Sequence, residues 1–379
     1  MKQVIFLSPA HPLRGGIASS TERLAQELQQ HGYQVRILSF SLQYPTFLFP
    51  GKTQYTDDPP PAGLEIEPVI NSINPLNWIK VGRKLKTLGP DLIIVRYWLP
   101  FMGPALGTIL RLGGKNARTK TIAITDNVIP HEHRPGDRIF TRYFLNAVDA
   151  CVVMSRAVKA DIRQFAEKMP VAYIPHPIYD NYGPAVARES ALQQLGLPAD
   201  LRYLLFFGFI RGYKGLDLLL EAMAAPEVRS LGVKLIVAGE FYDDPEPYQK
   251  LIREANLKEQ VILRNAYIPN GEVGLYFGAA DLVVQPYKSA TQSGISQLAF
   301  HFGKPMVVTR VGGLPEIVQH GKEGYVTDIS PKAIAEAITD FYQNHRQKAM
   351  EAAVQAGRSR FSWENMVRGI EDLITRQIK

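Results

Sequence analysis

Two cationic side chains follow an apolar run in the segment FFGFIRGYKG, residues 206–215. The run ends in Gly208, and Arg211 and Lys214 come three and six residues later. A guanidinium is a planar fork of donors and an ammonium is a compact point charge, so the pair suits a diphosphate. The glycines around them leave room for a ligand beside the backbone. The pattern predicts a phosphate site, with a solvated basic loop as the alternative.

Two glycines open a predicted helix in the segment HPLRGGIASSTERLAQEL, residues 11–28. Gly15 and Gly16 place no long side chain at the helix N-terminus, whose unpaired N–H groups and positive dipole end attract anions. A tight turn that binds nothing is the alternative reading of the two glycines. The spacing differs from the G-x-G-x-x-G fingerprint of dinucleotide-binding proteins, which argues against a dehydrogenase.

A second glycine-opened helix follows the apolar run DLVVQP, residues 281–286. The segment TQSGISQLAFHFGKP, residues 291–305, places small and polar residues before a helix with an apolar stripe. Its Ser-Gly pair predicts a second cradle for an anion, and the Gly-Lys-Pro sequence ends the helix. A third glycine turn, VGGLPEIV at residues 311–318, precedes a short helix.

Short apolar runs alternate with helical patterns along the whole chain, which is typical of parallel sheets covered on both faces. The sequence therefore predicts an α/β protein with two doubly wound domains. Ligands of such sheets bind beyond the carboxyl ends of the strands, so the candidate phosphate-binding turns of each domain share one edge. The predicted strands are 3–8, 34–40, 91–97, 120–125, 150–155 and 171–175 in the first half, and 202–208, 233–239, 260–264, 281–286, 305–309 and 324–328 in the second.

The predicted domain boundary lies in IPHPIYDNYGPAVARES, residues 174–190, which is rich in proline and has no periodic pattern. We assign residues 1–178 to the first domain and residues 179–361 to the second. Residues 41–75 are polar and rich in proline, which is compatible with a mobile loop or a short hairpin. The last segment, 362–379, is amphipathic and predicts one helix with Ser362 as its N-cap.

Composition limits the classes of protein to which this chain can belong. Hydrophobic residues make up 46% and charged residues 21% of the chain, as in ordinary globular proteins. Its one cysteine, Cys151, cannot form a disulfide within the chain, nor can one cysteine build a Cys-based metal site. No apolar run is long enough to span a membrane, and the N-terminus does not read as a signal peptide. We therefore expect a cytoplasmic protein, either free or on the inner face of the plasma membrane.

The positive charge is concentrated in the first half of the chain. Residues 1–177 contain 21 Lys/Arg and 13 Asp/Glu, a net +8, whereas residues 178–379 contain 22 and 23, a net −1. This asymmetry predicts an anionic partner for the first domain, such as a membrane, an acceptor or a nucleic acid. Residues 74–89 combine apolar and basic side chains that could lie on an anionic membrane, with an ordinary surface helix as the alternative.

The order of these motifs resembles that of the retaining glycosyltransferases of family 4, over essentially the whole chain. The matching motifs are the GG loop, the strand followed by G-x-x-R-x-x-K-G, VAGE, AADLVVQPY, the helix ending in GKP, and VGGLPEIV. The resemblance implies the GT-B fold, in which two Rossmann-like domains face each other across a cleft and the last helix crosses back onto the first. It implies a UDP- or GDP-linked nucleotide-sugar donor on the second domain and an acceptor on the first. It implies no metal and no further cofactor. The chain also lacks the interleaved aromatic and basic residues that single-strand binders use, so no nucleic-acid partner is expected.

The resemblance also assigns roles to individual residues. Arg211 and Lys214 would stabilise the departing nucleoside diphosphate, and either Asp126 or His131 would contact the transferred sugar or the acceptor hydroxyl. The residues implied to bind the donor are Gly15, Gly16, Gly208, Glu240, Tyr267, Ile268, Gln292, Ser293, Gly294 and Ile295; those implied to bind the acceptor are Arg14, Asn127 and His133.

The chain departs from the family pattern at two positions. The family often has two glutamates eight positions apart around the second glycine-opened helix, and here Ala290 and Leu298 stand in their places. The usual carboxylates for the ribose and the sugar hydroxyls are therefore missing, and Gln292 could replace them in part.

The sequence thus predicts a metal-independent retaining glycosyltransferase. Its acceptor could be a glycan, a lipid-linked glycan or a small molecule. The alternatives are another GT-B activity, a nucleotide-sugar epimerase or a phosphorylase, and a non-enzymatic anion-binding protein.

Overall fold

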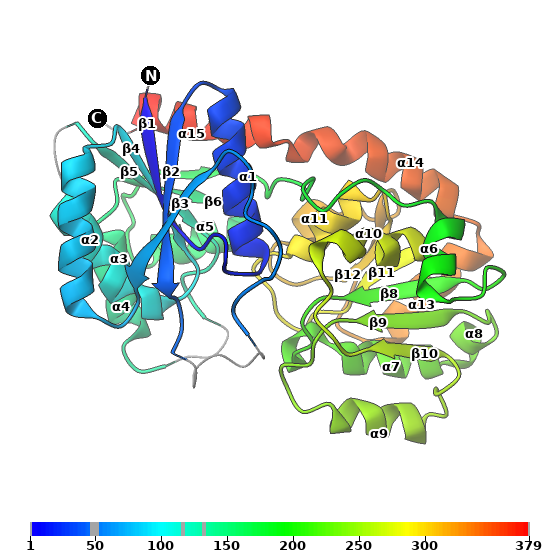
Figure 1. The fold of residues 1–379 in the computed structure, drawn as a ribbon. Helices are drawn as coiled ribbons and strands as arrows, with labels where there is room; N and C mark the ends of the chain where they lie inside the picture. Colours follow the sequence, from blue (N-terminus) through cyan, green and yellow to red (C-terminus); the bar gives the residue numbers. More distant parts are fainter. Residues whose placement is uncertain (1, 46–52, 115–117, 131–133, 378–379) are drawn as a thin grey trace. The chain divides into compact units, whose positions relative to one another are not determined.

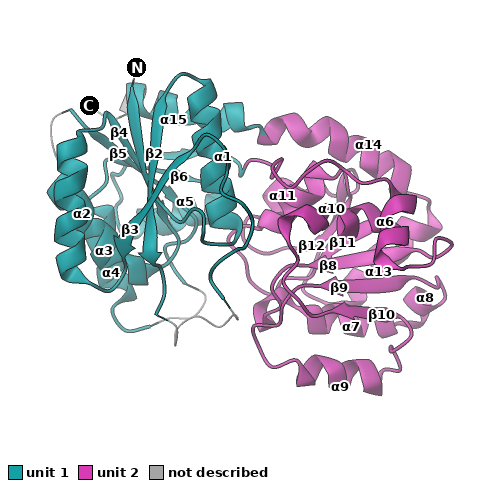
Figure 2. Ribbon diagram, in the orientation of Figure 1, with its two compact units in different colours: residues 1–176, 362–379 teal, residues 177–361 magenta. Residues whose placement is uncertain are grey.

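The computed structural model describes residues 2–45, 53–114, 118–130 and 134–377, which form two compact units (Figures 1 and 2). Unit 1 consists of residues 1–176 and 362–379, and unit 2 of residues 177–361. The chain thus leaves unit 1 after His176, two residues before the predicted boundary. No helix of the described residues is both long enough and apolar enough to cross a bilayer.

Unit 1 is built on a parallel sheet of seven strands in the order β3-β2-β1-β4-β5-β6-β7. The central strands are continuous apolar runs because helices cover both faces of the sheet. The strands are β1 (Gln3–Leu7), β2 (Gln34–Leu42), β3 (Glu65–Asn71), β4 (Leu92–Tyr97), β5 (Lys120–Thr125), β6 (Ala150–Val153) and β7 (Val171–Tyr173).

Strand β3 lies where the sequence suggested a loop or a hairpin, and that prediction was wrong. β3 pairs with β2 in parallel, from Arg36 opposite Glu65 to Leu42 opposite Asn71. Its residues EIEPVIN include two glutamates and Pro68, a composition that does not resemble a buried central strand. An edge strand tolerates a proline and polar side chains because only one of its sides is hydrogen-bonded.

Helices cover both faces of the sheet of unit 1. α2 (Pro75–Leu88), α3 (Gly103–Gly113), α4 (Asp137–Leu145) and α5 (Arg156–Arg163) pack on one face, and α1 (Gly16–Gln30) and α15 (Trp363–Gln377) on the other. A short 3-10 turn, η2 (Pro100–Met102), precedes α3. The last helix therefore returns to unit 1, where its Trp363 and Val367 are buried beside α1. The Ser362 hydroxyl accepts a hydrogen bond of 3.1 Å from the Asn365 N–H, as expected of an N-cap.

Unit 2 contains the six strands predicted for the second half, in one parallel sheet with the order β10-β9-β8-β11-β12-β13. The strands are β8 (Tyr203–Phe207), β9 (Lys234–Ala238), β10 (Val261–Arg264), β11 (Leu282–Gln285), β12 (Met306–Thr309) and β13 (Gly324–Thr327). The helices are α6 (Arg188–Leu195), α7 (Leu216–Ala224), α8 (Pro226–Arg229), α9 (Glu246–Glu254), α10 (Asn270–Ala279), α11 (Gly294–His301), α12 (Leu314–Ile317), α13 (Pro331–Gln343) and α14 (Gln347–Gly357), with 3-10 turns η3 (Gly212–Lys214) and η4 (Arg358–Phe361).

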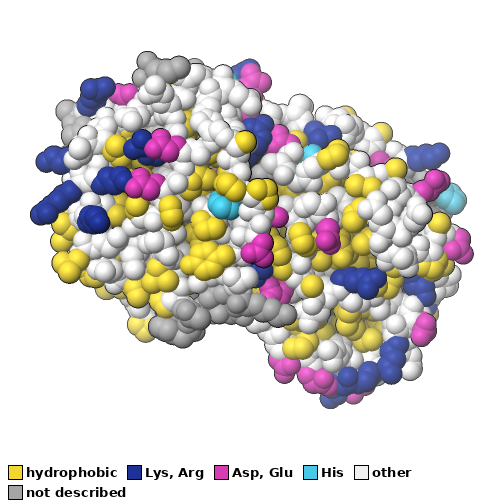
Figure 3. Space-filling model, viewed as in Figure 1, with side chains coloured by type: hydrophobic (Ala, Val, Ile, Leu, Met, Phe, Trp, Pro, Cys, Tyr) yellow, Lys and Arg dark blue, Asp and Glu magenta, His cyan; other side chains and the backbone are white. Residues whose placement is uncertain are grey.

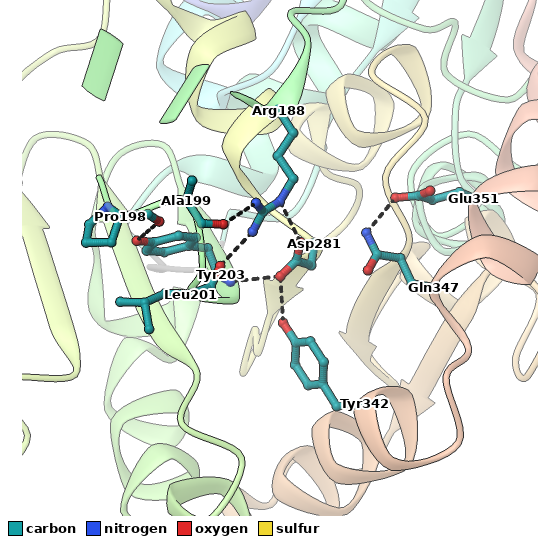
Figure 4. Close-up of polar contacts among 9 residues, drawn as sticks. All are labelled: Arg188, Pro198, Ala199, Leu201, Tyr203, Asp281, Tyr342, Gln347 and Glu351. Carbon is teal, nitrogen blue, oxygen red and sulfur yellow. Dashed lines mark hydrogen bonds and ion pairs between the residues drawn. The ribbon is translucent and has the colours of Figure 1, made fainter. Parts of the chain in front are cut away.

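A polar cluster fixes the amino-terminal edge of this sheet (Figure 4). The buried carboxylate of Asp281, just before β11, accepts hydrogen bonds from the Tyr203 N–H at 2.8 Å and the Tyr342 hydroxyl at 3.3 Å. Arg188 forms an ion pair with the same carboxylate at 3.3 Å and donates to the Leu201 carbonyl at 2.7 Å. The cluster joins α6 and α13 to the two central strands through groups that satisfy one another.

A cavity of about 300 Å³ opens beside this cluster, between α6, α10 and α14. Lys304 and Glu351 line it, and the Glu351 carboxylate accepts a hydrogen bond of 3.0 Å from Gln347 (Figure 4). Burial lowers the pKa of Lys304, and the Glu351 carboxylate partly opposes that effect. Because Lys304 precedes β12, the cavity lies at the edge opposite the predicted phosphate-binding turns.

At the carboxyl edge, the turns of unit 2 pack backbone against backbone at glycines. Gly215 has a φ of +70°, and a Cβ there would lie 2.0 Å from the Pro286 carbonyl oxygen. A Cβ on Gly312 would lie 1.6 Å from the Ala290 carbonyl oxygen. No side chain fits at these positions, so these turns can approach one another closely only with glycine present.

We predict that Gly215→Ala destabilises unit 2 at least twice as much as Gly232→Ala. Gly232 also has a positive φ of +66°, but no atom lies within 4 Å of its ideal Cβ. Its substitution should therefore cost only the backbone strain, roughly 1–2 kcal/mol. Urea unfolding followed by circular dichroism measures both variants, and equal losses would show that the contact with Pro286 is not limiting.

Candidate active site

The turns that follow β8 and β9 are joined at the carboxyl edge of unit 2. Ile210 donates to the Glu240 carbonyl at 2.9 Å, and the Tyr242 N–H donates to the Ile210 carbonyl at 3.0 Å. The Gly212 N–H donates to the Asp243 carboxylate at 2.6 Å. The segment that carries the two predicted cations is therefore held on a fixed backbone rather than in a free loop.

Lys214 is buried at this edge, with 8% of its surface exposed. Its ammonium lies 3.3 Å from the position that a Cβ of Gly208 would occupy and 5.8 Å from the centre of the Tyr287 ring. The side chain of Ile295, at the start of α11, contacts the same glycine. Among the residues that the structure describes, no acidic side chain forms an ion pair with Lys214.

The surroundings of Lys214 disfavour its charged form. Burial lowers the pKa of this lysine from 10.5 to about 7, and the neighbouring Arg211 guanidinium adds to the effect. A bound anion would act in the opposite direction and restore the charge. The site is therefore arranged for a group that brings negative charge with it.

Arg211 supplies the second cation from a half-buried position. Its guanidinium lies over the Tyr242 ring at 5.2 Å from the ring centre. A cation held over an aromatic face is weakly stabilised and is restricted in orientation. The stacking leaves the donors of the guanidinium available at the edge of the sheet.

The N-terminus of α11 reaches the same place. Ser293 is its N-cap, but no side chain caps the helix, and the Ser293 hydroxyl lies 3.3 Å from that of Tyr287. Gly294 packs against Tyr179 so closely that a Cβ would lie 2.7 Å from its ring. Together with Gly208 and Lys214, the residues Ser293 to Ile295 therefore form one cluster, as the motif spacing predicts.

The other predicted donor residues lie around this cluster. Glu240 is buried directly after β9, and Gln292 is half-buried just before the N-cap of α11. Tyr267 and Ile268 follow β10, and the Ile268 side chain belongs to the hydrophobic core. Ala290 and Leu298, the positions without the family's glutamates, are both buried in that core.

In unit 1, the glycine loop opens α1 at the carboxyl end of β1. Gly15 is the N-cap with a φ of +114°, and no atom lies within 4 Å of its ideal Cβ. Among the described residues no side chain caps α1, and its first turn, which begins at Gly16, contains no acidic residue. Arg14 is held in place by a hydrogen bond of 2.9 Å from its N–H to the Gln54 carbonyl.

Asp126 and Asn127 follow β5 at the same edge of unit 1. Both carboxylate oxygens of Asp126 accept from the buried Arg96, at 3.1 Å from Nε and 2.7 Å from a terminal nitrogen. The side-chain oxygen of Asn127 is buried and has no hydrogen-bond partner among the described residues. His131 and His133, the other two residues predicted here, lie outside the described residues.

Three residues of these sites were not found from the sequence. Arg96 lies inside the buried strand β4, where a single cation in an apolar run was the available signal. Tyr287 ends the motif AADLVVQPY, but the motif does not indicate that its ring lies against Lys214. Glu22 in α1 accepts from the His11 N–H at 2.6 Å, and burial raises the pKa of Glu22 to about 7, a shift that the hydrogen bond from His11 partly opposes.

The described residues contain no group of three or more His, Cys, Asp and Glu side chains that could hold a metal ion. The carboxyl edges of the two sheets instead present the N-termini of α1 and α11, which no side chain caps. Unit 2 also presents the cationic pair Arg211 and Lys214. Such groups can hold a phosphate or stabilise developing negative charge.

Comparison with known protein structures identifies relatives of the same fold. Sucrose-phosphate synthase of Thermosynechococcus elongatus superposes with a TM-score of 0.75 at 19% identity, covering 98% of each chain. HepE of Anabaena, in complex with UDP and glucose, superposes with a TM-score of 0.71 at 18% identity, covering 99% of this chain and all of the other. Likeness at these identities establishes the α/β GT-B fold.

Sequence relatives include D-inositol 3-phosphate glycosyltransferases of actinobacteria. The Streptomyces scabiei enzyme is 30% identical over 68% of this chain, and the match spans 60% of the length of that enzyme. The Thermobifida fusca enzyme is 27% identical over 94% of this chain and 87% of its own length.

Two family models match consecutive parts of the chain. Residues 14–181 match the model described as Glycosyltransferase Family 4, and residues 187–360 match Glycosyl transferases group 1. Together the two matches include nearly all of both units. The chain belongs to the family 4 glycosyltransferases and is a transferase enzyme of the GT-B fold.

Proposed function

We propose that this glycosyltransferase takes its sugar from a nucleotide-sugar donor bound at the carboxyl edge of unit 2, and that it retains the configuration of the transferred sugar. The observation that carries the proposal is the buried ammonium of Lys214, which has no acidic partner among the described residues and lies beside Arg211 and the uncapped start of α11. A diphosphate supplies the negative charge that this arrangement lacks. The UDP bound to the structurally similar HepE supports the same choice.

The chemistry that suits this site is departure of the diphosphate. The bond between the anomeric carbon and the phosphate oxygen breaks, and its electron pair goes to the nucleoside diphosphate. Arg211, Lys214 and the N–H groups of Gly294 and Ile295 stabilise that charge as it develops. The acceptor hydroxyl attacks from the face that the diphosphate leaves, and its proton passes to the departing phosphate. No metal and no protein nucleophile takes part in this scheme.

Further residues of unit 2 bind the rest of the donor in this proposal. The backbone at Tyr267 and Ile268 meets the base, and Glu240 lies beside the nucleotide. Gln292 takes over part of the role of the absent glutamates. Because Ala290 and Leu298 are buried and apolar, the hydroxyls of the ribose and of the sugar are held differently from those in family members with both carboxylates.

Unit 1 binds the acceptor in this proposal. The carboxylate of Asp126, which Arg96 holds in place, is one candidate for contact with a sugar or acceptor hydroxyl, because a carboxylate can accept several hydrogen bonds. His131 is the other candidate for this contact, and Arg14, Asn127 and His133 are proposed to hold the acceptor. Gly15 and Gly16 let the donor phosphate approach α1. A cytoplasmic chain in contact with an anionic membrane is part of the proposal, supported by the excess of cations in the first half.

Lys214→Ala should lower the turnover number by a factor on the order of 10² or more, because one preorganised positive charge is lost from the leaving-group site. Release of the nucleoside diphosphate from UDP- and GDP-sugars, with and without candidate acceptors, measures this. Lys304→Ala is the matched control, since Lys304 is also a largely buried lysine of unit 2 but lies at the opposite edge of the sheet. Near-normal turnover in Lys214→Ala would exclude the role.

Nucleoside diphosphate binding should take up protons at pH 8. At that pH most Lys214 ammonium groups are deprotonated in the free protein, because the pKa is about 7. The bound diphosphate raises the pKa, so up to one proton enters the complex and affinity falls as the pH rises above 7. Calorimetry in two buffers of different ionisation enthalpy measures the uptake. An uptake that persists unchanged in Lys214→Met would assign it to another group.

Lys214→Met should stabilise the free protein at and below pH 7. The folded pKa of about 7 lies below the ordinary lysine pKa of 10.5, so the unfolded chain holds the proton more tightly. The cost of burying the ammonium is therefore full below pH 7 and disappears as the pH rises towards 10.5. Thermal unfolding from pH 6 to pH 10 should show the advantage of the variant shrinking over this window. The same variant should lose the thermal shift given by the nucleoside diphosphate, which Lys304→Met should keep.

A further inference from the structure

Helices α2, α3 and α4 lie side by side on one face of unit 1 (Figure 1). The neighbouring helices meet through small residues. A Cβ on Gly82 of α2 would lie 2.7 Å from Leu112 of α3, and one on Gly107 of α3 would lie 2.8 Å from the Tyr143 ring of α4. The three helices and the residue Ile73 just before α2 form a continuous surface, which we call the α2–α4 face.

The α2–α4 face carries most of the net charge of the protein. The three helices contain seven Lys or Arg residues and one acidic residue, Asp137, a net +6, whereas the whole chain has a net charge of +7. One of the seven, Lys84, forms an ion pair with Glu67 of β3. The other six have no acidic partner at ion-pair distance among the residues described; they are Lys80, Arg83, Lys86, Arg111, Arg138 and Arg142.

The same face exposes large apolar side chains. Nine large hydrophobic side chains are exposed among the described residues, and seven of them belong to this face. Leu76 and Ile139 are the most exposed, at 77% and 72%. The seven are Ile73, Leu76, Ile79, Leu112, Ile139, Phe140 and Tyr143. In Figure 3, basic side chains and, below them, hydrophobic side chains gather next to one another on the left side of unit 1.

The combination distinguishes this face from an ordinary charged surface. Exposed leucine and isoleucine gain by leaving water, and single-sign charge around them repels a second copy of the same face. Nucleic acid would satisfy the cations but would leave the aliphatic side chains in water. An anionic bilayer satisfies both, because basic side chains meet the headgroups while the apolar ones enter the boundary of the acyl chains.

We propose that the α2–α4 face binds the protein peripherally to an anionic lipid bilayer. A transferase held on a bilayer by its acceptor-binding unit is suited to a lipid-linked acceptor. This second inference refines the proposed function and rests on it, because it takes unit 1 to be the acceptor-binding unit. Arg111 illustrates the fit, since its guanidinium lies 3.8 Å from the centre of the exposed Tyr143 ring and forms one cationic and aromatic surface with it.

Vesicle flotation of the full chain tests the contact directly, with no donor present. Vesicles of phosphatidylcholine with about 30% phosphatidylglycerol should carry the protein, and pure phosphatidylcholine vesicles should not. Raising the salt to about 0.5 M should release most of it, because the Debye length, which sets the reach of the surface potential, falls to about 4 Å.

Two variants with matched controls locate the contact. Lys80→Glu/Arg83→Glu should reduce the partition coefficient at least tenfold, whereas Lys322→Glu/Lys348→Glu on unit 2 makes the same change in net charge and should have a much smaller effect. Leu76→Ser/Ile139→Ser should also weaken binding at constant charge, whereas Ile329→Ser removes an exposed isoleucine of unit 2 and should not. All substituted side chains are exposed, so the fold should be retained.

Three outcomes would overturn the proposal. The protein could fail to float with anionic vesicles, or the α2–α4 variants could have the same partition coefficients as their controls. Alternatively, heparin or single-stranded DNA could bind through this face while vesicles do not. Nucleotide-dependent thermal shifts of the same variants separate this result from the proposed function. Lost flotation with an intact shift removes only the membrane contact, and intact flotation with no shift for any nucleotide removes only the proposed donor site.

Discussion

The buried ammonium of Lys214 is the constraint on which the rest of unit 2 depends. Removing a charge from water without a partner is costly, and here burial together with Arg211 lowers the pKa to about 7. The surrounding fold supplies the free energy that offsets this cost. Backbone hydrogen bonds join the turn after β8 to the turn after β9. At the amino-terminal edge of the same sheet, the Asp281 cluster holds the central strands in place. Under the proposed function, a bound diphosphate supplies the negative charge that this buried ammonium lacks.

The glycines explain how so many turns meet around one side chain. At Gly208, Gly215 and Gly312 a Cβ would meet another side chain or a carbonyl oxygen at close range. Because the strands are parallel, their turns all emerge at the carboxyl edge, and the glycines allow the backbones to approach. The proposed diphosphate site is therefore mostly backbone, with Lys214 and Arg211 as its charged residues.

The two units use positive charge in different ways. Unit 2 buries one lysine at the end of a strand, where a single anion can pair with it. Unit 1 spreads cations over the α2–α4 face, where most are exposed to solvent and each would interact weakly with a partner. Because burial strengthens electrostatic interactions, the first arrangement suits specific binding of a small ligand and the second suits reversible contact with an extended surface.

The sequence by itself determined the repeated α/β pattern, the family and the turns that form the candidate site. Apolar runs of strand length and glycines at helix starts are local features, so Arg211, Lys214 and Ser293 could be located from spacing alone. Tertiary structure decided the rest. The burial of Lys214 against Tyr287, the pairing of Arg96 with Asp126 and the edge strand β3 depend on residues distant in the chain. The α2–α4 face likewise joins three helices that are separate in sequence. Such contacts arise only when the sheet aligns its elements, which local pattern does not encode.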